Sequence, residues 1–394
     1  MGEMIEIKGS QSYPTLQELI EQGKKSFEEH FNRKASAVGY SPGRVNLIGE
    51  HVDYNDGFVL PMAIPLYTVV VGSANELDVC RVHTLYEQAD KPHQMELKYD
   101  QLKPEPPVWS NYVKGVMANF PGSKINFDAV IVTSNPVGGG LSSSAALELS
   151  LFKFLSALSD PAVSKSEMAL LCQRADHHFV GVPCGIMDQM AVAVGQKDHA
   201  ILLDCRSLKT ELVPLSDQNL VVLVANSGIR HKLVSSEYAQ RRRCCEQVAS
   251  MMGKRSLRDV SMKELETSQS VFQMETYQYG RHVITEIERT LSAAEALKKN
   301  DYLVFGALMT QSHISLRDDY KVSIPEIDEL CEVAVKCDGV YGSRITGGGF
   351  GGCTVTLVRA DKVESTIEEM STKCRCKPLF YVFKPCDGAN LTKL

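Results

Sequence analysis

A glycine- and serine-rich turn, Pro136-Val137-Gly138-Gly139-Gly140-Leu141-Ser142-Ser143-Ser144-Ala145, lies between a predicted strand ending at Thr133 and a predicted helix beginning near Ser143. Glycines let the backbone approach an anion closely, and free amides at a helix N-terminus point toward it. The serine hydroxyls can donate to phosphate or reach Mg²⁺. A strand-to-helix connection with a serine cap explains the same residues, so local chemistry leaves both interpretations open. The turn is not a Walker A loop, because no Gly-Lys-Ser/Thr follows.

A second glycine cluster is Thr346-Gly347-Gly348-Gly349-Phe350-Gly351-Gly352, which satisfies the spacing G-x-G-x-x-G. A predicted strand over residues 353–358 follows it, whereas a dinucleotide-binding turn opens a helix. A protein-kinase glycine loop is disfavoured as well, since no H-R-D or D-F-G sequence comes after it. We expect a bent, closely packed loop. Its composition leaves open whether it also touches phosphate.

A third segment, residues 43–55, packs a cation, two carboxylates, an imidazole and two amides into a turn-rich stretch. Such groups form paired hydrogen bonds to adjacent sugar hydroxyls and reject sugars that lack one of them. A surface loop with capping polar groups is the alternative. Further on, Asp188 stands among apolar neighbours in Gly185-Ile186-Met187-Asp188-Gln189-Met190. It either caps a helix or acts with Arg44, which requires Arg44 to lie beside it in space.

The remaining pattern predicts mixed α and β structure. Thr15 and Ser164 each begin a capping box with a glutamate three residues later, which predicts helices over residues 15–32 and from 164 to near Gly181. Residues 41–63 read as short strands joined by turns. Further strands are predicted at 66–71, 128–133, 220–225, 353–358 and 379–383.

Composition limits the class of protein. A chain of 394 residues, 44% hydrophobic and 23% charged, suffices for two domains with separate cores, and we place their boundary near residue 215. The net charge of −6 does not favour binding to the negatively charged backbone of nucleic acid. The twelve cysteines are about 3% of the chain, too sparse for a secreted scaffold. No signal-peptide core lies in residues 1–6 and no apolar run is long enough to span a membrane. We therefore expect a cytoplasmic protein without nucleic-acid or membrane partners.

Together these segments resemble galactokinases, members of the superfamily that also contains homoserine, mevalonate and phosphomevalonate kinases (GHMP kinases). Residues 43–55 are nearly the galactokinase signature, 136–145 resemble the phosphate loop and 346–352 the third motif. Similar stretches occur at 109–115, 184–189 and 235–238, so the resemblance covers about residues 15–385.

The resemblance implies a two-domain α+β GHMP-kinase fold, with an N-terminal domain over 1–215, a C-terminal domain over 216–394 and the active site in the cleft between them. It implies phosphoryl transfer from MgATP to the C1 hydroxyl of D-galactose, the first committed step of galactose catabolism, by a monomer or weak homodimer. An N-acetylgalactosamine kinase is one alternative. A non-catalytic galactose and ATP sensor is another, but such sensors resemble galactokinases with a shortened serine loop, which is complete here.

By resemblance, specific residues take specific roles. Asp188 would take the proton from the sugar hydroxyl or mainly orient that hydroxyl, and Arg44 would stabilise the transferred phosphoryl group. The residues expected to bind galactose are Arg44, Glu50, His51, Asp53, Gly185, Asp188 and Tyr238. Those expected to bind ATP are Trp109, Gly138, Gly140, Ser142, Ser143 and Ser144. The expected magnesium partners are Ser144 and Asp176.

Two positions depart from the family pattern. Asp176 stands where relatives commonly carry the longer Glu, and because Mg²⁺ readily keeps several waters we expect weaker metal binding rather than inactivity. Val52 stands where Thr is usual, with Glu50, His51 and Asp53 intact around it. We interpret Val52 as a packing change that leaves sugar recognition in place.

Overall fold

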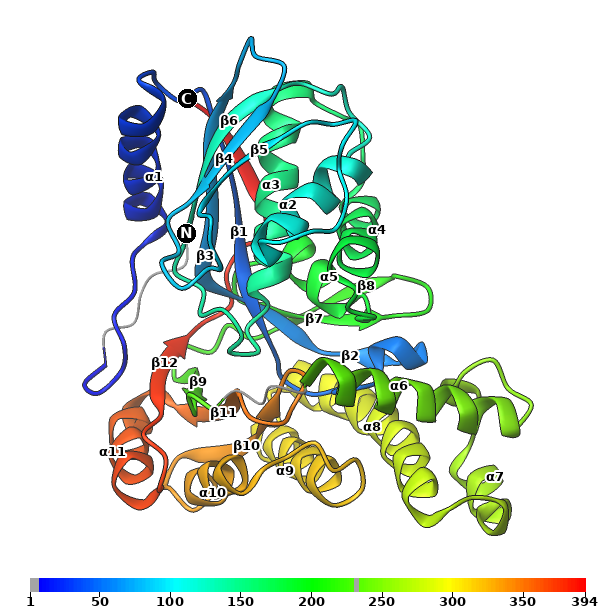
Figure 1. The fold of residues 1–394 in the computed structure, drawn as a ribbon. Coiled ribbons are helices and arrows are strands. Elements are labelled where there is room, and N and C mark those ends of the chain that lie inside the picture. The colour runs from blue at the N-terminus through cyan, green and yellow to red at the C-terminus, as the bar shows by residue number, and fades with distance from the viewer. Residues whose placement is uncertain (1–6, 230–233) are drawn as a thin grey trace.

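The computed structural model describes residues 7–229 and 234–394, so the expectation for residues 1–6 lies outside the described part. Its largest sheet has six strands in the order β13-β1-β3-β6-β4-β5 (Figure 1). Neighbouring strands are antiparallel except β4 and β6, which are parallel. The bounds are β1 Ala37–Asn46, β3 Pro61–Ala74, β4 Cys80–Thr84, β5 Gln94–Leu97, β6 Phe127–Thr133 and β13 Asn390–Lys393.

Helices cover both faces of this sheet. Helix α1 lies on one face, and α2, α3, α4 and α5 gather on the other (Figure 1). The capping boxes at Thr15 and Ser164 are present as predicted, and each supplies side-chain acceptors to the free backbone amides at the start of its helix. The helix bounds are α1 Leu16–Phe31, α2 Val108–Asn119, α3 Ser143–Ser159, α4 Lys165–Ala175 and α5 Met187–Val194.

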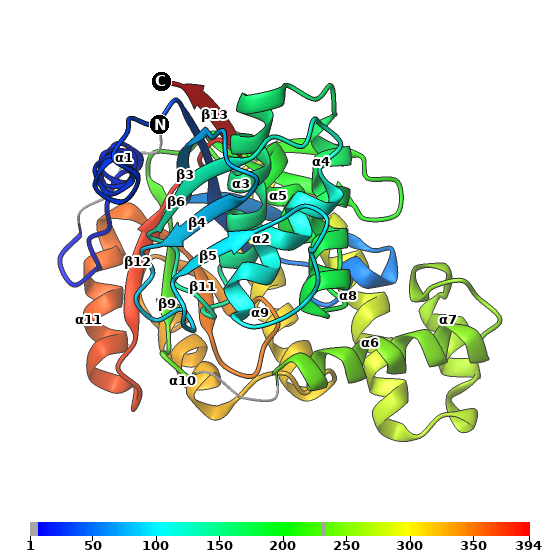
Figure 2. The ribbon, with the colours of Figure 1, turned by 45° about the horizontal axis from the view of Figure 1, so that its top comes forward.

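A second, antiparallel sheet of four strands, in the order β10-β11-β9-β12, forms the other lobe. Helices α9, α10 and α11 accompany this sheet, and α6, α7 and α8 extend to one side (Figures 1 and 2). The strands are β9 Leu220–Asn226, β10 Val340–Thr346, β11 Cys353–Arg359 and β12 Leu379–Phe383. The helices are α6 Val234–Met251, α7 Met262–Thr267, α8 Met274–Lys298, α9 Tyr302–Asp318, α10 Pro325–Ala334 and α11 Val363–Lys373.

The chain passes between the lobes more than once. A small sheet of β2 Phe58–Val59, β7 His199–Asp204 and β8 Thr210–Pro214 ends just before β9 opens the second sheet. After β12 the chain returns, and β13 pairs with β1 at the edge of the six-stranded sheet (Figure 2). We propose that the domains divide near residue 215, with the last strand belonging to the N-terminal lobe. Among the described residues no helix is long and apolar enough to cross a membrane.

Two local predictions were wrong in detail. Residues 41–46 and 61–63 belong to the long strands β1 and β3, because pairs such as Val45 with Met62 bury both side chains and extend the ladder. The helix from Ser164 does not continue regularly to Gly181. Helix α4 ends at Ala175, and the chain widens into a π-helical turn over Asp176–Val180, a feature often found at functional sites.

Candidate active site

Two neighbouring cavities, one between the lobes and one within the lobe of the six-stranded sheet, share part of their lining. The Asp188 cavity, of about 520 Å³, takes its walls from residues 44–53, 176–189, Tyr238 and the second glycine cluster. The Trp109 cavity, of about 260 Å³, is lined mainly by residues 84–90, α2 and the start of α3. Ser144 and Tyr112 line both cavities, so the two cavities are adjacent.

Arg44 and Asp188 meet in the larger cavity. Arg44 lies on β1 and is only 4% exposed, while Asp188 stands in the first turn of α5. Arg44 Nε donates to Asp188 Oδ1 at 2.9 Å, and Nη2 donates to the same oxygen. Arg44 Nη1 donates to the carbonyl of Gly140 at 2.6 Å. One guanidinium therefore orients the carboxylate and ties it to the glycine- and serine-rich turn.

The conformation of residues 136–145 decides between the two interpretations of that turn. Gly138 and Gly140 both have φ of +75°, and Ser142 occupies the N-cap of α3 with φ of +61°. Within the described residues no side chain caps α3, because the Ser142 hydroxyl donates to Asp188 Oδ2 instead. The first amides of α3 remain available to an anion, as a phosphate loop requires.

The second glycine cluster packs directly against this loop. It joins β10 to β11 as a hairpin connection, consistent with a strand rather than a helix following it. Cys353 Sγ donates to the carbonyl of Gly139 at 2.9 Å, and a Cβ on Gly347 would lie 3.1 Å from the carbonyl oxygen of Gly140. Gly347 and Gly348 also line the Asp188 cavity. The cluster is thus the closely packed loop that was predicted, and it forms part of the site wall.

The side chains of Glu50, His51 and Asp53 face the same cavity. The buried Glu50 accepts hydrogen bonds from Asn46 Nδ2 and, at 2.6 Å, from the backbone amide of Gly347. Burial lowers the pKa of His51 to about 3, so this imidazole is neutral. Burial, reinforced by the charge of Asp188, raises the pKa of Asp53 to about 6. Val52 is fully buried in the apolar core, consistent with a packing role.

Asp176 and Ser144 supply oxygen donors to the cavity wall. Asp176 begins the π-helical turn, and its Oδ2 accepts Gln189 Nε2 at 2.9 Å and Cys184 Sγ at 3.5 Å. Burial, with the charge of Asp188 adding to it, raises the pKa of Asp176 to about 7. Among the described residues no cluster of three or more His, Cys, Asp or Glu could hold a metal by itself. A hydroxyl and one carboxylate nevertheless fit Mg²⁺, which keeps waters and binds substrate phosphates.

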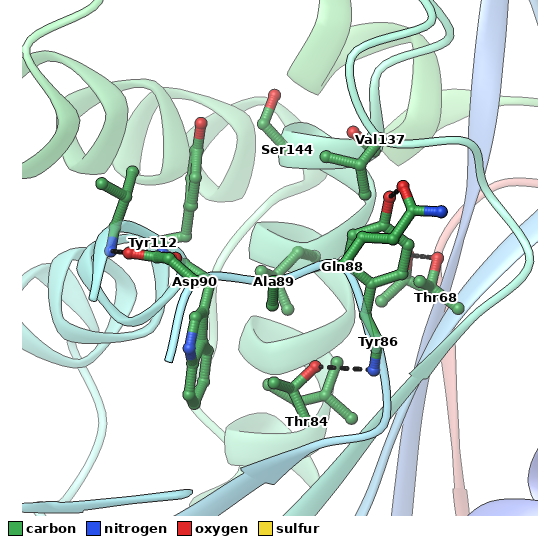
Figure 3. Close-up of a pocket in the computed structure, with 15 residues that line it drawn as sticks. Thr68, Thr84, Tyr86, Gln88, Ala89, Asp90, Tyr112, Val137 and Ser144 are labelled. Atoms are coloured by element: carbon green, nitrogen blue, oxygen red, sulfur yellow. Dashed lines mark hydrogen bonds between the residues drawn. The ribbon is translucent and has the colours of Figure 1, made fainter. Parts of the chain in front are cut away.

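The Trp109 cavity combines an indole with the start of α3. Trp109 Nε1 donates to the carbonyl of Pro92 at 3.1 Å, and its backbone amide donates to Asp90. Figure 3 shows Tyr86, Gln88, Ala89 and Asp90 along one side of this cavity, with Val137 and Ser144 across from them. The lining is mostly apolar and reaches the glycine- and serine-rich turn, as a purine base next to bound phosphates requires.

Most of the predicted site residues line one or both of these cavities. The Asp188 cavity is lined by Arg44, Glu50, His51, Asp53, Gly138, Ser144, Asp176, Gly185, Asp188 and Tyr238. The smaller cavity is lined by Trp109, Ser143 and Ser144. Gly140 and Ser142 line neither cavity, but contact Arg44 and Asp188. Sequence reasoning missed Tyr112 and Gln189. The helical spacing of Tyr112 from Trp109 could have indicated the first, whereas Gln189 carried no signal beyond its place beside Asp188.

Known proteins resemble this chain along its whole length. The galactokinase galactose-binding signature matches residues 25–74, and the GHMP kinase N-terminal and C-terminal domains match 111–196 and 293–376. Galactokinases of Bos taurus and Homo sapiens are each 48% identical over 383 residues, which cover 96% of this chain and 98% of theirs. The Chloroflexus aurantiacus galactokinase is 42% identical over 88% of this chain and 90% of its own.

Solved structures agree with the sequence comparison. The galactokinase of Lactococcus lactis, solved with galactose, superposes with a TM-score of 0.88 at 32% identity, covering 94% of this chain and 98% of its own. The mevalonate kinase of Methanococcus jannaschii shares the fold, with a TM-score of 0.63 at 17% identity over 89% of this chain and 98% of its own. The predicted GHMP-kinase fold is therefore confirmed, and the chain belongs to the galactokinase family.

Proposed function

We propose that this chain is an ATP-dependent sugar kinase that phosphorylates the C1 hydroxyl of D-galactose, giving galactose 1-phosphate and ADP. The observation that carries the proposal is the Arg44–Asp188 pair. It lies between the polar Asp188 cavity and the glycine- and serine-rich loop at the N-terminus of α3. The galactose-binding signature over residues 25–74 and the relative solved with galactose support the choice of sugar.

Each residue of the site has a separate role in phosphoryl transfer. A bond forms between the sugar O1 and the γ-phosphorus as the bond from that phosphorus to the β,γ-bridging oxygen breaks, and ADP leaves. The O1 proton passes to Asp188, whose carboxylate is oriented by Arg44 and Ser142. Arg44 also lies where it can stabilise charge on the transferred group. The free amides of α3 and residues 138–144 hold the phosphates, and Trp109 lies beside the base.

Mg²⁺ is proposed to bind at Ser144 and Asp176, with Gln189 orienting the carboxylate. When bound, the metal neutralises phosphate charge. Gln189 Nε2 donates to Asp176 Oδ2, which leaves the other carboxylate oxygen for the metal or its water.

The decisive test is a coupled assay of ADP release with MgATP across galactose, N-acetylgalactosamine, glucose, mevalonate and homoserine. Turnover on galactose alone supports the proposal. Preferential turnover on N-acetylgalactosamine would replace it with the acetylated sugar. Binding of galactose and ATP without release of ADP would instead identify a sensor.

Acid should weaken galactose binding through Asp53. The pKa of this carboxyl is raised to about 6, so the group is mostly protonated below that pH and loses acceptor capacity for sugar hydroxyls. We expect the KM for galactose to rise about tenfold from neutral pH to pH 5. The measurement is a pH profile of kcat/KM. The Asp53→Asn variant should show a high KM that no longer depends on pH in this range, and an unchanged profile would exclude Asp53 as the titrating group.

Trp109 should report nucleotide binding directly. It is the one tryptophan in the chain and lines the smaller cavity. Because indole emission depends on local polarity and stacking, titration with ADP should change the fluorescence of the wild type, whereas galactose alone should change it little. A response to galactose but none to ADP would contradict assignment of this cavity to the base.

Loss of Gln189 should weaken metal binding. Gln189→Leu removes the amide that donates to Asp176, and we expect about tenfold weaker binding of Mg²⁺, in line with outer-shell substitutions at metal sites. The measurements are the Mg²⁺ dependence of the rate and Mn²⁺ binding to the ADP complex by electron paramagnetic resonance. Gln173→Leu is the matched control, because Gln173 donates to the Cys184 carbonyl and not to Asp176. Equal metal affinity in both variants would contradict the role of Gln189.

A further inference from the structure

A chain of hydrogen bonds runs from His51 away from the Asp188 cavity. His51 Nδ1 lies 2.7 Å from the hydroxyl of Tyr54, which lies 2.8 Å from the hydroxyl of Tyr320. The Tyr320 hydroxyl lies 3.1 Å from Cys245 Sγ. His51 and Tyr54 belong to the segment of residues 43–55, whereas Cys245 is on α6 and Tyr320 follows α9. The relay thus joins the N-terminal lobe to the C-terminal lobe.

The proton count along this relay links its bonds. Each tyrosine hydroxyl carries one proton, so a hydroxyl between two partners donates to one and accepts from the other. If His51 Nδ1 donates to Tyr54, then Tyr54 donates to Tyr320 and Tyr320 to Cys245. If Cys245 donates instead, all three bonds reverse and Nδ1 accepts. The two directions assign opposite tautomers to a neutral imidazole, because Nε2 must take the role opposite to that of Nδ1. The tautomer of His51 and the direction of the relay therefore change together.

The other ring nitrogen of His51 is the one left open. Nε2 is buried and forms no hydrogen bond of ordinary geometry among the described residues, although the Gly348 backbone beside the ring raises the pKa of His51 slightly against the larger effect of burial. The His51 side chain lines the Asp188 cavity. Packing fixes the ring in place: its centroid lies 4.9 Å from that of Tyr320 and 5.4 Å from that of Tyr238. A buried polar atom with no partner is costly unless a ligand satisfies it.

We propose that Tyr54, Tyr320 and Cys245 are positioning residues that couple the tautomer of His51 to the direction of the relay, so that the role Nε2 offers to a hydroxyl of the bound sugar depends on all three hydrogen bonds behind it. The inference rests on the proposed function for the identity of the sugar. It explains why two tyrosines and a thiol are buried in series behind a histidine. Removal of a link far from the cavity should therefore alter sugar affinity through the histidine, while Arg44 and Asp188 keep their geometry.

The test uses Tyr320→Phe, which deletes one hydroxyl and keeps the ring that packs on His51. We expect the KM for galactose to rise roughly tenfold with kcat changed less than about threefold, the cost of one misdirected buried hydrogen bond. Nitrogen NMR of histidine-labelled protein without sugar should show a ratio of the two His51 tautomers in the variant that differs from that in the wild type. The His51→Gln variant assigns the resonances. Tyr279→Phe is the matched control, since the Tyr279 ring also packs on Tyr320 but its hydroxyl donates to Glu275.

Cys245 provides an independent test that alters no aromatic packing. Cys245→Ser keeps a donor and an acceptor at the end of the relay and should retain the wild-type tautomer ratio and KM, whereas Cys245→Ala should change both. Tyr320→Phe and Cys245→Ala proteins with unchanged KM and an unchanged His51 spectrum would overturn the inference. Failure of the wild type to phosphorylate galactose would refute the proposed function alone, because the sugar-free spectra still report on the relay.

Discussion

Asp188→Asn is expected to lower kcat for galactose by roughly 10²–10⁴-fold, the range for loss of a general base, while galactose and ATP still bind. Asparagine keeps the shape of the side chain and can still accept from Arg44 Nε, but it cannot take the proton of the sugar hydroxyl. The measurement is ADP release under saturating substrates, together with calorimetric titration of galactose. Because the lost interaction belongs to the transition state, kcat and kcat/KM should fall together.

The matched control for Asp188→Asn is Asp204→Asn. Asp204 is also a carboxylate paired with an arginine, Arg258, but it does not line either cavity. The control should therefore leave kcat unchanged even if stability falls. A loss of less than about tenfold in Asp188→Asn, with binding intact, would show that the carboxylate mainly orients the hydroxyl and accepts its proton late.

Local features of the fold were predictable because their causes lie within a few residues. The helix over Leu16–Phe31 follows from a capping box at Thr15 and apolar residues at helical spacing. The strands β6, β9, β11 and β12 were each predicted to within one residue from their β-branched and aromatic content. The π-helical turn at Asp176 had no such local signal, and Asp176 at its start is held by Gln189 and Cys184, which follow later in the sequence.

The sequence predicted which residues form the site, but not which of them contact one another. Arg44 and Asp188 are 144 residues apart in the sequence, so their pairing became visible only in three dimensions. The same holds for Ser142, whose hydroxyl could have capped α3 by local chemistry and instead donates to Asp188. The relay behind His51 is the extreme case. Tyr54 and Tyr320 are separated by 266 residues, and no motif connects them.

Gly185→Ala is expected to raise the KM for galactose roughly 10²-fold, because an added methyl group would displace a sugar-binding carboxylate by about an ångström. A Cβ on Gly185 would lie 1.8 Å from Asp53 Oδ2 and 2.1 Å from its Cγ. Asp53 cannot retreat without losing the bond in which the Tyr54 amide donates to Oδ1 at 3.0 Å. Steady-state kinetics should show the change in KM for galactose, with that for ATP little altered.

Gly280→Ala on α8 is the matched control, since its nearest neighbour would be a Leu265 methyl at 3.3 Å and alanine favours a helix interior. If Gly185→Ala acts through Asp53, then adding Asp53→Asn should raise KM little further, because both changes remove the same contact. Fully additive effects would instead mean that Gly185 matters for sugar binding by a separate route, such as direct approach of its backbone to a hydroxyl. A KM within about threefold of wild type would show that the segment around Cys184 shifts to accept the methyl group, and that the clash is relieved at little energetic cost.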